Sequence, residues 1–372
     1  MSISFRLATA ADAQACNAFH RAFSRKSRTP AQWQWEFNER HADRPILYAL
    51  AVDGDTIVGS QALIRVPMRG PDGIIQTAKG EDTLIAPRYW GKSILRPLFD
   101  LLIEHAQAER IRLLWGFNAA RATFKKIGFR YLDDNVLLLI RPLSAAALGR
   151  IASHHGSGRP RATHRLTWRH RIVTNPLGAH AVIAATQVLS AIGTVTHALR
   201  RQDITVNVLD QVPSSIEGLV ARFTTQTRAL TVDRSPQFLQ WRLAQNAFVP
   251  STLMAGFRNG EMVGFASFCI TPDLQGIVTD LIALDEDTTF TLLASATRRL
   301  RDAGAERVQT LLTDKAAASV ATLSAARRLG YVRVPTNMGA CVLPLDGAPP
   351  EEALLRTNNW HFTNINTEGR QG

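Results

Sequence analysis

The pattern of apolar and polar residues over the first 140 positions predicts helices and strands in a definite order. Apolar residues three and four positions apart predict helices over 11–23 and 94–108, and Thr29-Pro30 is typical of a third helix start. Short apolar runs predict strands at 3–7, 47–52, 57–66 and 82–86. The order is a strand, two helices and an antiparallel meander, followed by strand, turn, helix and strand.

The stretch 81–95 predicts a strand, an anion-binding turn and a helix start. Pro87 ends the strand, because proline fixes φ and has no N–H group for the ladder. Gly91 gives the turn its backbone freedom, and Ser93 is expected to cap the helix that follows. Unpaired N–H groups at the helix start, the helix dipole and Lys92 together favour a bound phosphate.

The same pattern recurs in the second half of the chain. Four matches follow in the same order: Thr29-Pro30 with Ser235-Pro236, Asp53-Gly54 with Asn259-Gly260, Ala106 to Ile111 with Ala303 to Val308, and Lys125 to Phe129 with Arg327 to Tyr331. We interpret this as a tandem duplication. The second copy has Asp285, Glu286 and Asp287 where the first has the phosphate turn, so we expect it to keep the fold and to bind no cofactor.

The stretch from Thr83 to Leu95 resembles motif A of the GNAT N-acyltransferases, and Asn118 with Phe124 to Phe129 resembles a later block of that family. The resemblance covers most of residues 1–140. It implies an α/β (α+β) fold of two tandem GNAT-like domains, each a mixed, mostly antiparallel sheet flanked by helices. It also implies acetyl-CoA, or another acyl-CoA, as co-substrate and no metal. The implied cofactor contacts are Leu84, Ile85, Trp90, Gly91, Lys92, Ser93, Ile94, Leu95, Asn118 and Phe124.

Acyl transfer to an amine needs a base, an oxyanion donor and a proton source for the thiolate. Strand alternation places Glu81, Thr83 and Ile85 on one face, with Asp82 on the other. Glu81 is the candidate base, acting directly or through water, with Thr83 beside it in the catalytic group. Phe124 stands where the family often has the tyrosine that protonates the thiolate, so that proton is expected from water or another neighbour.

The charge distribution singles out the middle of the chain. The formal net charge is +12, and residues 135–202 contain no Asp or Glu. Residues 172–199 are uncharged between flanking arginines, which predicts a packed bridging helix and leaves a membrane-surface helix or a true span as alternatives. An anionic membrane surface is therefore an expected partner for residues 172–201.

These patterns predict four segments and a location. The segments are a catalytic acyl-CoA-binding domain at 1–140, a basic linker with a bridging helix at 141–204, a degenerate second GNAT-like domain at 205–346 and a polar tail at 347–372. Three unclustered cysteines argue against disulfides and a zinc site. The N-terminus lacks a signal-peptide pattern, so we expect a cytoplasmic protein, with peripheral membrane contact as an open alternative.

The resemblance implies an N-acyltransferase that moves an acetyl or related acyl group from acyl-CoA to a small-molecule amine, such as an amino sugar or another biosynthetic intermediate. Two alternatives stay open. The paired halves also resemble the aminoacyl-tRNA-dependent, FemAB-like transferases of peptidoglycan bridge synthesis, in which case the basic middle would contact tRNA. Trp90, Ser93, Leu95 and Phe124 depart from the GNAT pattern, which would suit a non-catalytic binding protein on the same scaffold.

Overall fold

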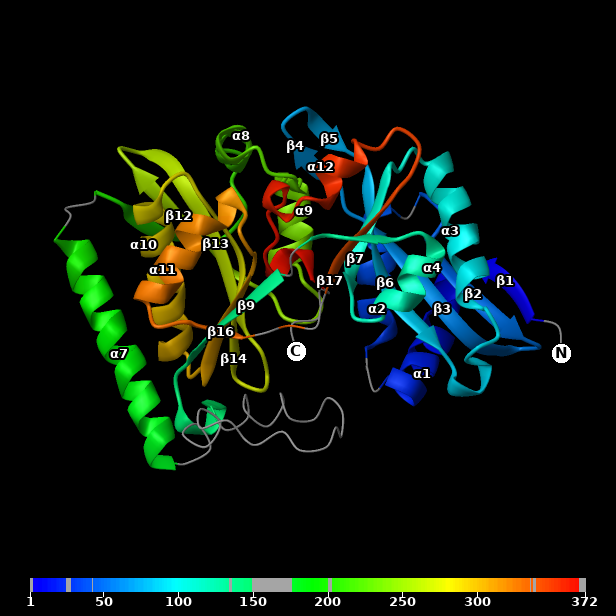
Figure 1. The fold of residues 1–372 in the computed structure, drawn as a ribbon, viewed down its shortest axis with the longest axis horizontal. Coiled ribbons are helices and arrows are strands. Elements are labelled where there is room, and N and C mark those ends of the chain that lie inside the picture. Colours follow the sequence, from blue (N-terminus) through cyan, green and yellow to red (C-terminus); the bar gives the residue numbers. More distant parts are fainter. Residues whose placement is uncertain are drawn as a thin grey trace. The chain divides into compact units, whose positions relative to one another are not determined.

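The computed structural model describes residues 3–24, 28–41, 43–133, 136–148, 176–199, 203–334, 336 and 339–367. The chain forms two compact units (Figure 1). The first comprises Met1–Asn135, Ala229–Asp233 and Asn337–Trp360, and the second comprises Val136–Arg228, Arg234–Thr336 and His361–Gly372. Each unit is a mixed sheet with helices packed on it, which confirms the predicted fold class.

The first unit contains a seven-stranded sheet. Its order is β1 (Ile3–Leu7), β2 (Tyr48–Asp53), β3 (Thr56–Arg65), β6 (Thr77–Ile85), β7 (Leu113–Asn118), β17 (Gly339–Pro344) and β8 (Arg130–Tyr131). The helices are α1 (Ala13–Ser24), α2 (Pro30–Phe37), α3 (Leu95–Ala108), α4 (Arg121–Ile127) and α12 (Glu351–Leu355). A small sheet has the order β11 (Thr231–Val232), β4 (Met68–Gly70) and β5 (Gly73–Ile75). Thr29 caps α2 and Pro30 is its first residue, as predicted.

Helices α1 and α3 lie on opposite faces of β3. A side chain at Gly59 would meet Ile85 and Ile94, which lie on the α3 side. The next residue, Ser60, instead bonds to His20 of α1, at 3.0 Å. Because neighbouring residues of a strand point to opposite faces, both faces of the sheet are covered. The core includes Leu98, Phe99 and Leu102 of α3 packed on sheet residues such as Ala78 and Leu114.

The second unit repeats this order of elements. Its sheet runs β10 (Thr205–Leu209), β12 (Thr252–Arg258), β13 (Glu261–Ile270), β14 (Gln275–Ala283), β15 (Arg307–Thr313), β9 (Val136–Pro142) and β16 (Val332–Val334). Its helices are α7 (Pro176–Ala198), α8 (Ile216–Thr227), α9 (Pro236–Leu239), α10 (Glu286–Asp302) and α11 (Val320–Arg328). In both sheets the fourth and fifth strands are parallel, and the other pairs are antiparallel.

The sixth strand of each sheet comes from the other half of the chain. Strand β9 follows β8 in sequence but pairs with β15 and β16, whereas β17 follows β16 and pairs with β7 and β8. The predicted boundaries at 140, 204 and 346 are therefore wrong, because they assume contiguous domains. Residues 229–233 also belong to the first unit, since β11 pairs with β4.

The polar tail predicted at 347–372 is also incorrect over its described part. Residues 351–355 form α12, and Trp360, Phe362 and Ile365 are buried. A helix is present in the predicted linker as α7, but it belongs to the second unit. Residues 149–175 and 200–202 of the predicted linker, including 172–175, 200 and 201 of the predicted membrane segment, lie outside the described residues, as do 368–372.

Candidate functional site

Strands β6 and β7 separate partway along their length. They pair only from Thr77 to Lys79, opposite Leu113 to Trp115. A bulge in β6 follows, where the register with β3 shifts and Asp82 has a φ of 51° in the left-handed region. Beyond Lys79 the backbone groups of β6 that face β7 have no ladder partner on that strand. A ligand that enters this divergence can therefore pair with backbone donors and acceptors.

The turn between β6 and α3 exposes backbone N–H groups. Gly91 and Ser93 have φ values of 82° and 55°, and α3 begins at Leu95 with Ile94 as an N-cap that makes no side-chain hydrogen bond. The predicted Ser93 cap is wrong, because Ser93 precedes the N-cap and has a left-handed backbone. The N–H groups at the start of α3 therefore lack both a helical partner and a capping side chain.

The same turn is positively charged. Residues 86–99 include Arg88, Lys92 and Arg96 and contain no Asp or Glu, although Arg96 is paired with Asp100 at 2.7 Å. Lys92 Nζ lies 4.6 Å from the centre of the Tyr89 ring. Trp90 is 71% exposed, and its indole Nε1 donates to the Ile85 carbonyl at 2.9 Å. Unpaired amides, a helix N-terminus and cations thus converge where the sequence predicts a phosphate.

The two predicted catalytic residues lie at the bulge but have different partners. Glu81 is buried and forms an ion pair with Lys79. Thr83 is exposed and donates to the side chain of Gln61, whose amide donates in turn to the Glu81 carbonyl at 3.1 Å. The strand alternation expected from Glu81 to Ile85 is interrupted by the bulge at Asp82.

The other predicted contacts are spread between the divergence and the core. Leu84 and Ile85 are half-buried at the end of β6. Asn118, at the end of β7, accepts a hydrogen bond from the Ala120 amide at 2.6 Å and so shapes the start of α4. Phe124 lies in the core, with its ring 5.7 Å from Phe99 and 5.2 Å from Phe129. Its role here is packing.

A buried polar network beside the bulge was not predicted. The Arg28 guanidinium contacts Asp82, Glu36 at 2.6 Å and Asn17 at 2.9 Å. Tyr48 donates to Asp82 at 3.0 Å, and burial raises the pKa of this tyrosine well above its usual value. A sequence signal existed, because Arg28 precedes Thr29-Pro30 just as Arg234 precedes Ser235-Pro236.

The second unit has the same divergence, but the chain fills it. Strands β14 and β15 pair only from Gln275 to Ile277. Beyond that point the Asn364 side chain donates to the Val278 carbonyl and the Phe362 amide donates to Thr313 of β15, both at 2.8 Å. The C-terminal segment thus forms hydrogen bonds with both of the separated strands, β14 and β15.

In the second unit the N-terminus of α10 is capped by a side chain. Asp285 is the N-cap of α10 and accepts a hydrogen bond from the Thr288 amide at 2.8 Å. Burial acts to raise the pKa of Asp285, but hydrogen bonds from Arg258 and Thr288 hold it below the usual value. A capped helix start with three carboxylates in sequence repels a phosphate.

Comparison with known proteins shows what the first unit and the overall fold are similar to. Residues 4–132 match the family model described as an acetyltransferase (GNAT) domain. No curated protein matches. A GCN5-related N-acetyltransferase from Kribbella flavida is similar at 12% identity with a TM-score of 0.55, over 93% of this chain and 72% of that one. One from Anabaena variabilis is similar at 9% identity with a TM-score of 0.56, over 92% and 72%. At these identities the likeness to the solved structures concerns the fold.

Proposed function

Because residues 4–132 form a GNAT acetyltransferase domain, we propose that this protein is an N-acyltransferase that moves an acetyl or related acyl group from acyl-CoA to a small-molecule amine. The catalytic centre is the divergence of β6 and β7 in the first unit. The repeated order of elements supports a tandem GNAT arrangement in which the second unit has lost the cofactor site. The acceptor class proposed is an amino sugar or another biosynthetic amine.

The observation that supports this most strongly is the contrast between the two helix starts. In the first unit α3 begins without a side-chain cap, beside Lys92 and Arg96. In the second unit Asp285 caps α10. The proposed site of the CoA pyrophosphate is the turn from Gly91 to Leu95, where the Lys92 amide donates to the Tyr89 carbonyl and the helix dipole and the cations favour negative charge.

The thioester end of the cofactor is placed at the end of β6. There the pantetheine pairs with the backbone around Leu84 and Ile85, and unpaired amides at the divergence donate to the carbonyl oxygen as negative charge develops on it. The Trp90 indole donates a hydrogen bond to the Ile85 carbonyl in this structure. The indole must therefore move if the pantetheine is to donate to that carbonyl. Phe124 supplies no proton, and the thiolate takes its proton from water.

Glu81 is the proposed base for the acceptor amine. Its carboxylate forms a buried ion pair with the Lys79 ammonium, and this pair is disrupted when Glu81 takes up a proton. Thr83 and Gln61, which are hydrogen-bonded to one another beside it, are positioned to orient the acceptor.

Calorimetry with acetyl-CoA tests the cofactor site. Gly91→Asp places a carboxylate in the phosphate turn and is expected to abolish binding. Gly304→Asp is the matched control, because Gly304 has a similar φ of 88° and also has open space around it. Unchanged affinity in Gly91→Asp would refute this site. Binding of tRNA without CoA would instead favour a tRNA-dependent transferase, and binding of neither would favour a non-catalytic protein.

A further inference from the structure

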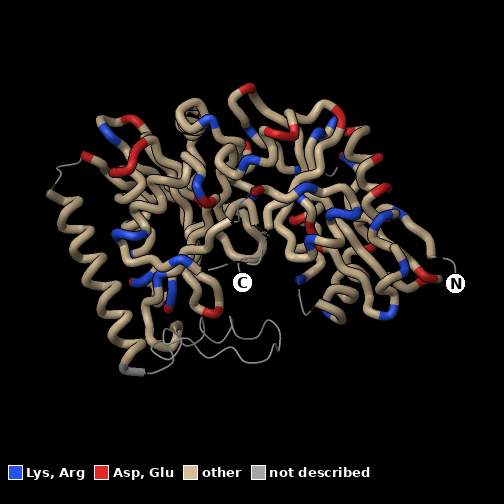
Figure 2. The backbone as a smooth tube through the Cα atoms, in the orientation of Figure 1, with Lys and Arg blue, Asp and Glu red and all other residues tan. Residues whose placement is uncertain are grey.

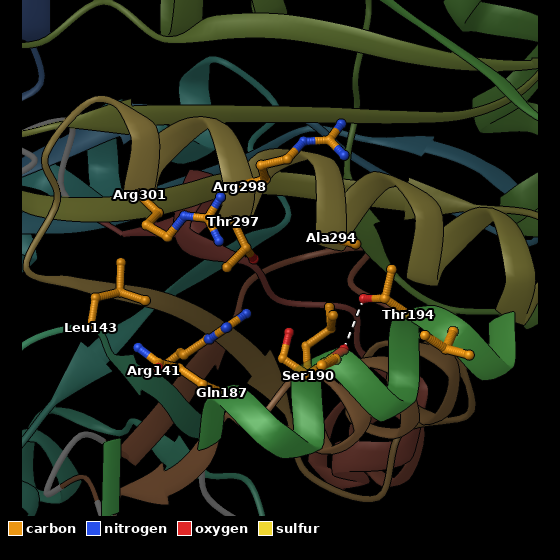
Figure 3. Close-up of a pocket in the computed structure, with 12 residues that line it drawn as sticks. Arg141, Leu143, Gln187, Ser190, Thr194, Ala294, Thr297, Arg298 and Arg301 are labelled. Atoms are coloured by element: carbon orange, nitrogen blue, oxygen red, sulfur yellow. Dashed lines mark hydrogen bonds between the residues drawn. The ribbon is translucent and has the colours of Figure 1, made fainter. Parts of the chain in front are cut away.

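The second unit holds a cavity between α7 and α10 that the acyltransferase proposal does not use. Its volume is about 560 Å³, and the twelve described residues that line it include Arg141, Arg298 and Arg301. None of the twelve is an Asp or Glu. Figure 3 shows Arg141 and Arg301 projecting into the space between the two helices. The described lining of the cavity is therefore positively charged.

Arg141 is the buried member of this set. It lies on β9, is 6% exposed, and its Nε has no hydrogen-bond acceptor among the described residues. Burial lowers the pKa of Arg141; Tyr331 opposes this, and nearby Arg301 lowers it further. A buried guanidinium without a carboxylate partner is costly, and a phosphate that accepts its N–H groups would remove that cost.

The other two arginines lie at the edge of the cavity. Both are exposed on α10, and Arg301 also contacts the exposed carboxylate of Asp302 at 2.8 Å. Ser190 adds a hydroxyl group to the lining, whereas the Thr194 and Thr297 hydroxyls donate to the backbone carbonyls of Ser190 and Leu293. Guanidinium groups are the usual ligands of a phosphate oxygen.

The helix beside this cavity exposes a row of apolar side chains. Val188, Ile192, Val195 and Leu199 are 57%, 55%, 59% and 77% exposed. Val188, Ile192 and Val195 are spaced by four and three residues and so lie on one side of α7, and Leu199 directly follows the helix. Figure 2 shows no Lys, Arg, Asp or Glu along the described part of this helix. A surface helix of a soluble domain ordinarily carries its charged face outward, so this face is suited to an apolar environment.

The opposite side of α7 is packed on the second unit. Ala179 and Ile183 are buried with Leu148. A side chain at Gly193 would lie 2.5 Å from the Arg328 carbonyl, so α7 approaches α11 closely there. By length and composition alone α7 could cross a membrane, since its window from Gly178 to Ala198 has a mean hydropathy of 1.4. A helix packed along one side of a folded unit is better suited to lying in the interface than to spanning the bilayer.

We propose that α7 and this cavity bind an anionic phospholipid, with the phosphate held by Arg141, Arg298 and Arg301 and the acyl chains against the exposed face of α7. Val195 joins the two parts, because it lines the cavity and belongs to the apolar face. A cationic cavity thus lies beside an apolar helix face. This combination matches a phospholipid, whose anionic headgroup adjoins its apolar acyl chains.

Flotation of the full chain with vesicles tests this proposal. We expect binding to vesicles of equal parts phosphatidylcholine and phosphatidylglycerol, and little binding to phosphatidylcholine alone. The double variant Arg298→Gln/Arg301→Gln should bind about tenfold or more weakly. The matched double variant Arg299→Gln/Arg327→Gln removes the same charge outside the cavity and should bind nearly normally. Ile192→Gln, on the exposed face, should weaken binding without loss of Tm.

Three results would overturn the proposal. Equal binding to the neutral and anionic vesicles would exclude headgroup recognition. An equal loss in the matched double variant would mean that overall charge, rather than the cavity, attracts the membrane. Binding of free glycerol 1-phosphate in calorimetry, lost in Arg298→Gln/Arg301→Gln, together with absence of vesicle binding, would assign the cavity to a soluble phosphate.

Discussion

Arg234 and Asp280 form a buried, two-pronged ion pair, and Arg28 and Asp82 form a buried ion pair through one guanidinium nitrogen at the corresponding place in the first unit. Arg234 Nε and Nη2 lie 2.7 and 2.9 Å from the two Asp280 carboxylate oxygens, and neither side chain is exposed. In each unit the arginine directly precedes a Ser/Thr-Pro helix start and the aspartate lies on the strand that separates from its neighbour. The pair therefore joins that helix start to the divergence.

The first prediction concerns this pair. Asp280→Asn is expected to lower the free energy of unfolding by about 3–5 kcal/mol, because it leaves a buried guanidinium without its counter-charge. Urea denaturation measures the loss. Asp302→Asn is the control, since Asp302 and Arg301 form an exposed pair whose removal has a small effect.

A double variant distinguishes the loss of the whole ion pair from the loss of one of its charges. Arg234→Met/Asp280→Leu removes both charges and should be more stable than Asp280→Asn, because no unpaired buried charge remains. If Asp280→Asn unfolds at the same urea concentration as the unmodified protein, the pair has no structural role in the second unit.

The second prediction is a pH dependence caused by His361. Burial and the neighbouring Arg234 lower the pKa of His361 to about 3, although Asp280 opposes this shift. The unfolded histidine has a pKa of about 6.5. Between these values the unfolded chain binds a proton that the folded chain does not, so stability falls as the pH drops from about 6.5 to about 3.

His361→Gln tests this pH dependence. The variant should show a flatter loss of stability between pH 6.5 and about 3, measured by urea denaturation at several pH values. His180→Gln changes an exposed histidine of the same unit and should keep the original slope. An unchanged slope in His361→Gln would place the proton uptake elsewhere.

The local fold was predictable because local patterns determine it. The helix start at Thr29-Pro30, the hairpin at Asp53-Gly54 and the strand ending before Pro87 all follow from turn and capping chemistry. The exchange of β9 and β17 between the two sheets was not predictable. Both are short apolar strands, and neither sequence specifies which sheet the strand joins.

The site was only partly predictable for a related reason. The phosphate turn is contiguous in sequence, so its glycine and lysine are recognised together. The contact between Arg28 and Asp82 joins residues far apart in sequence, and Asn364 appeared to be part of a polar loop. Its side chain bonds to an unpaired strand carbonyl, a role that polarity alone does not reveal.

The third prediction concerns the proposed base. Glu81→Gln should lower kcat by about 10²- to 10⁴-fold with little change in KM for acetyl-CoA. Lys79→Met removes the partner of the buried Glu81 carboxylate and should also lower kcat, because that ion pair holds the carboxylate in place. Lys126→Met removes an exposed lysine and should leave kcat unchanged. A Glu81→Gln rate within about twofold of the original would remove Glu81 from the mechanism.

The last prediction is a stoichiometry of one acetyl-CoA per chain. The first unit offers an uncapped helix start and a divergence with free strand edges. In the second unit Asp285 caps α10, and the Asn364 side chain donates a hydrogen bond to the Val278 carbonyl at the divergence. Calorimetry should therefore give one site, retained in Asp285→Ala and lost in Gly91→Asp. Two sites per chain, or one site that survives Gly91→Asp, would show that the second unit binds the cofactor despite its filled divergence.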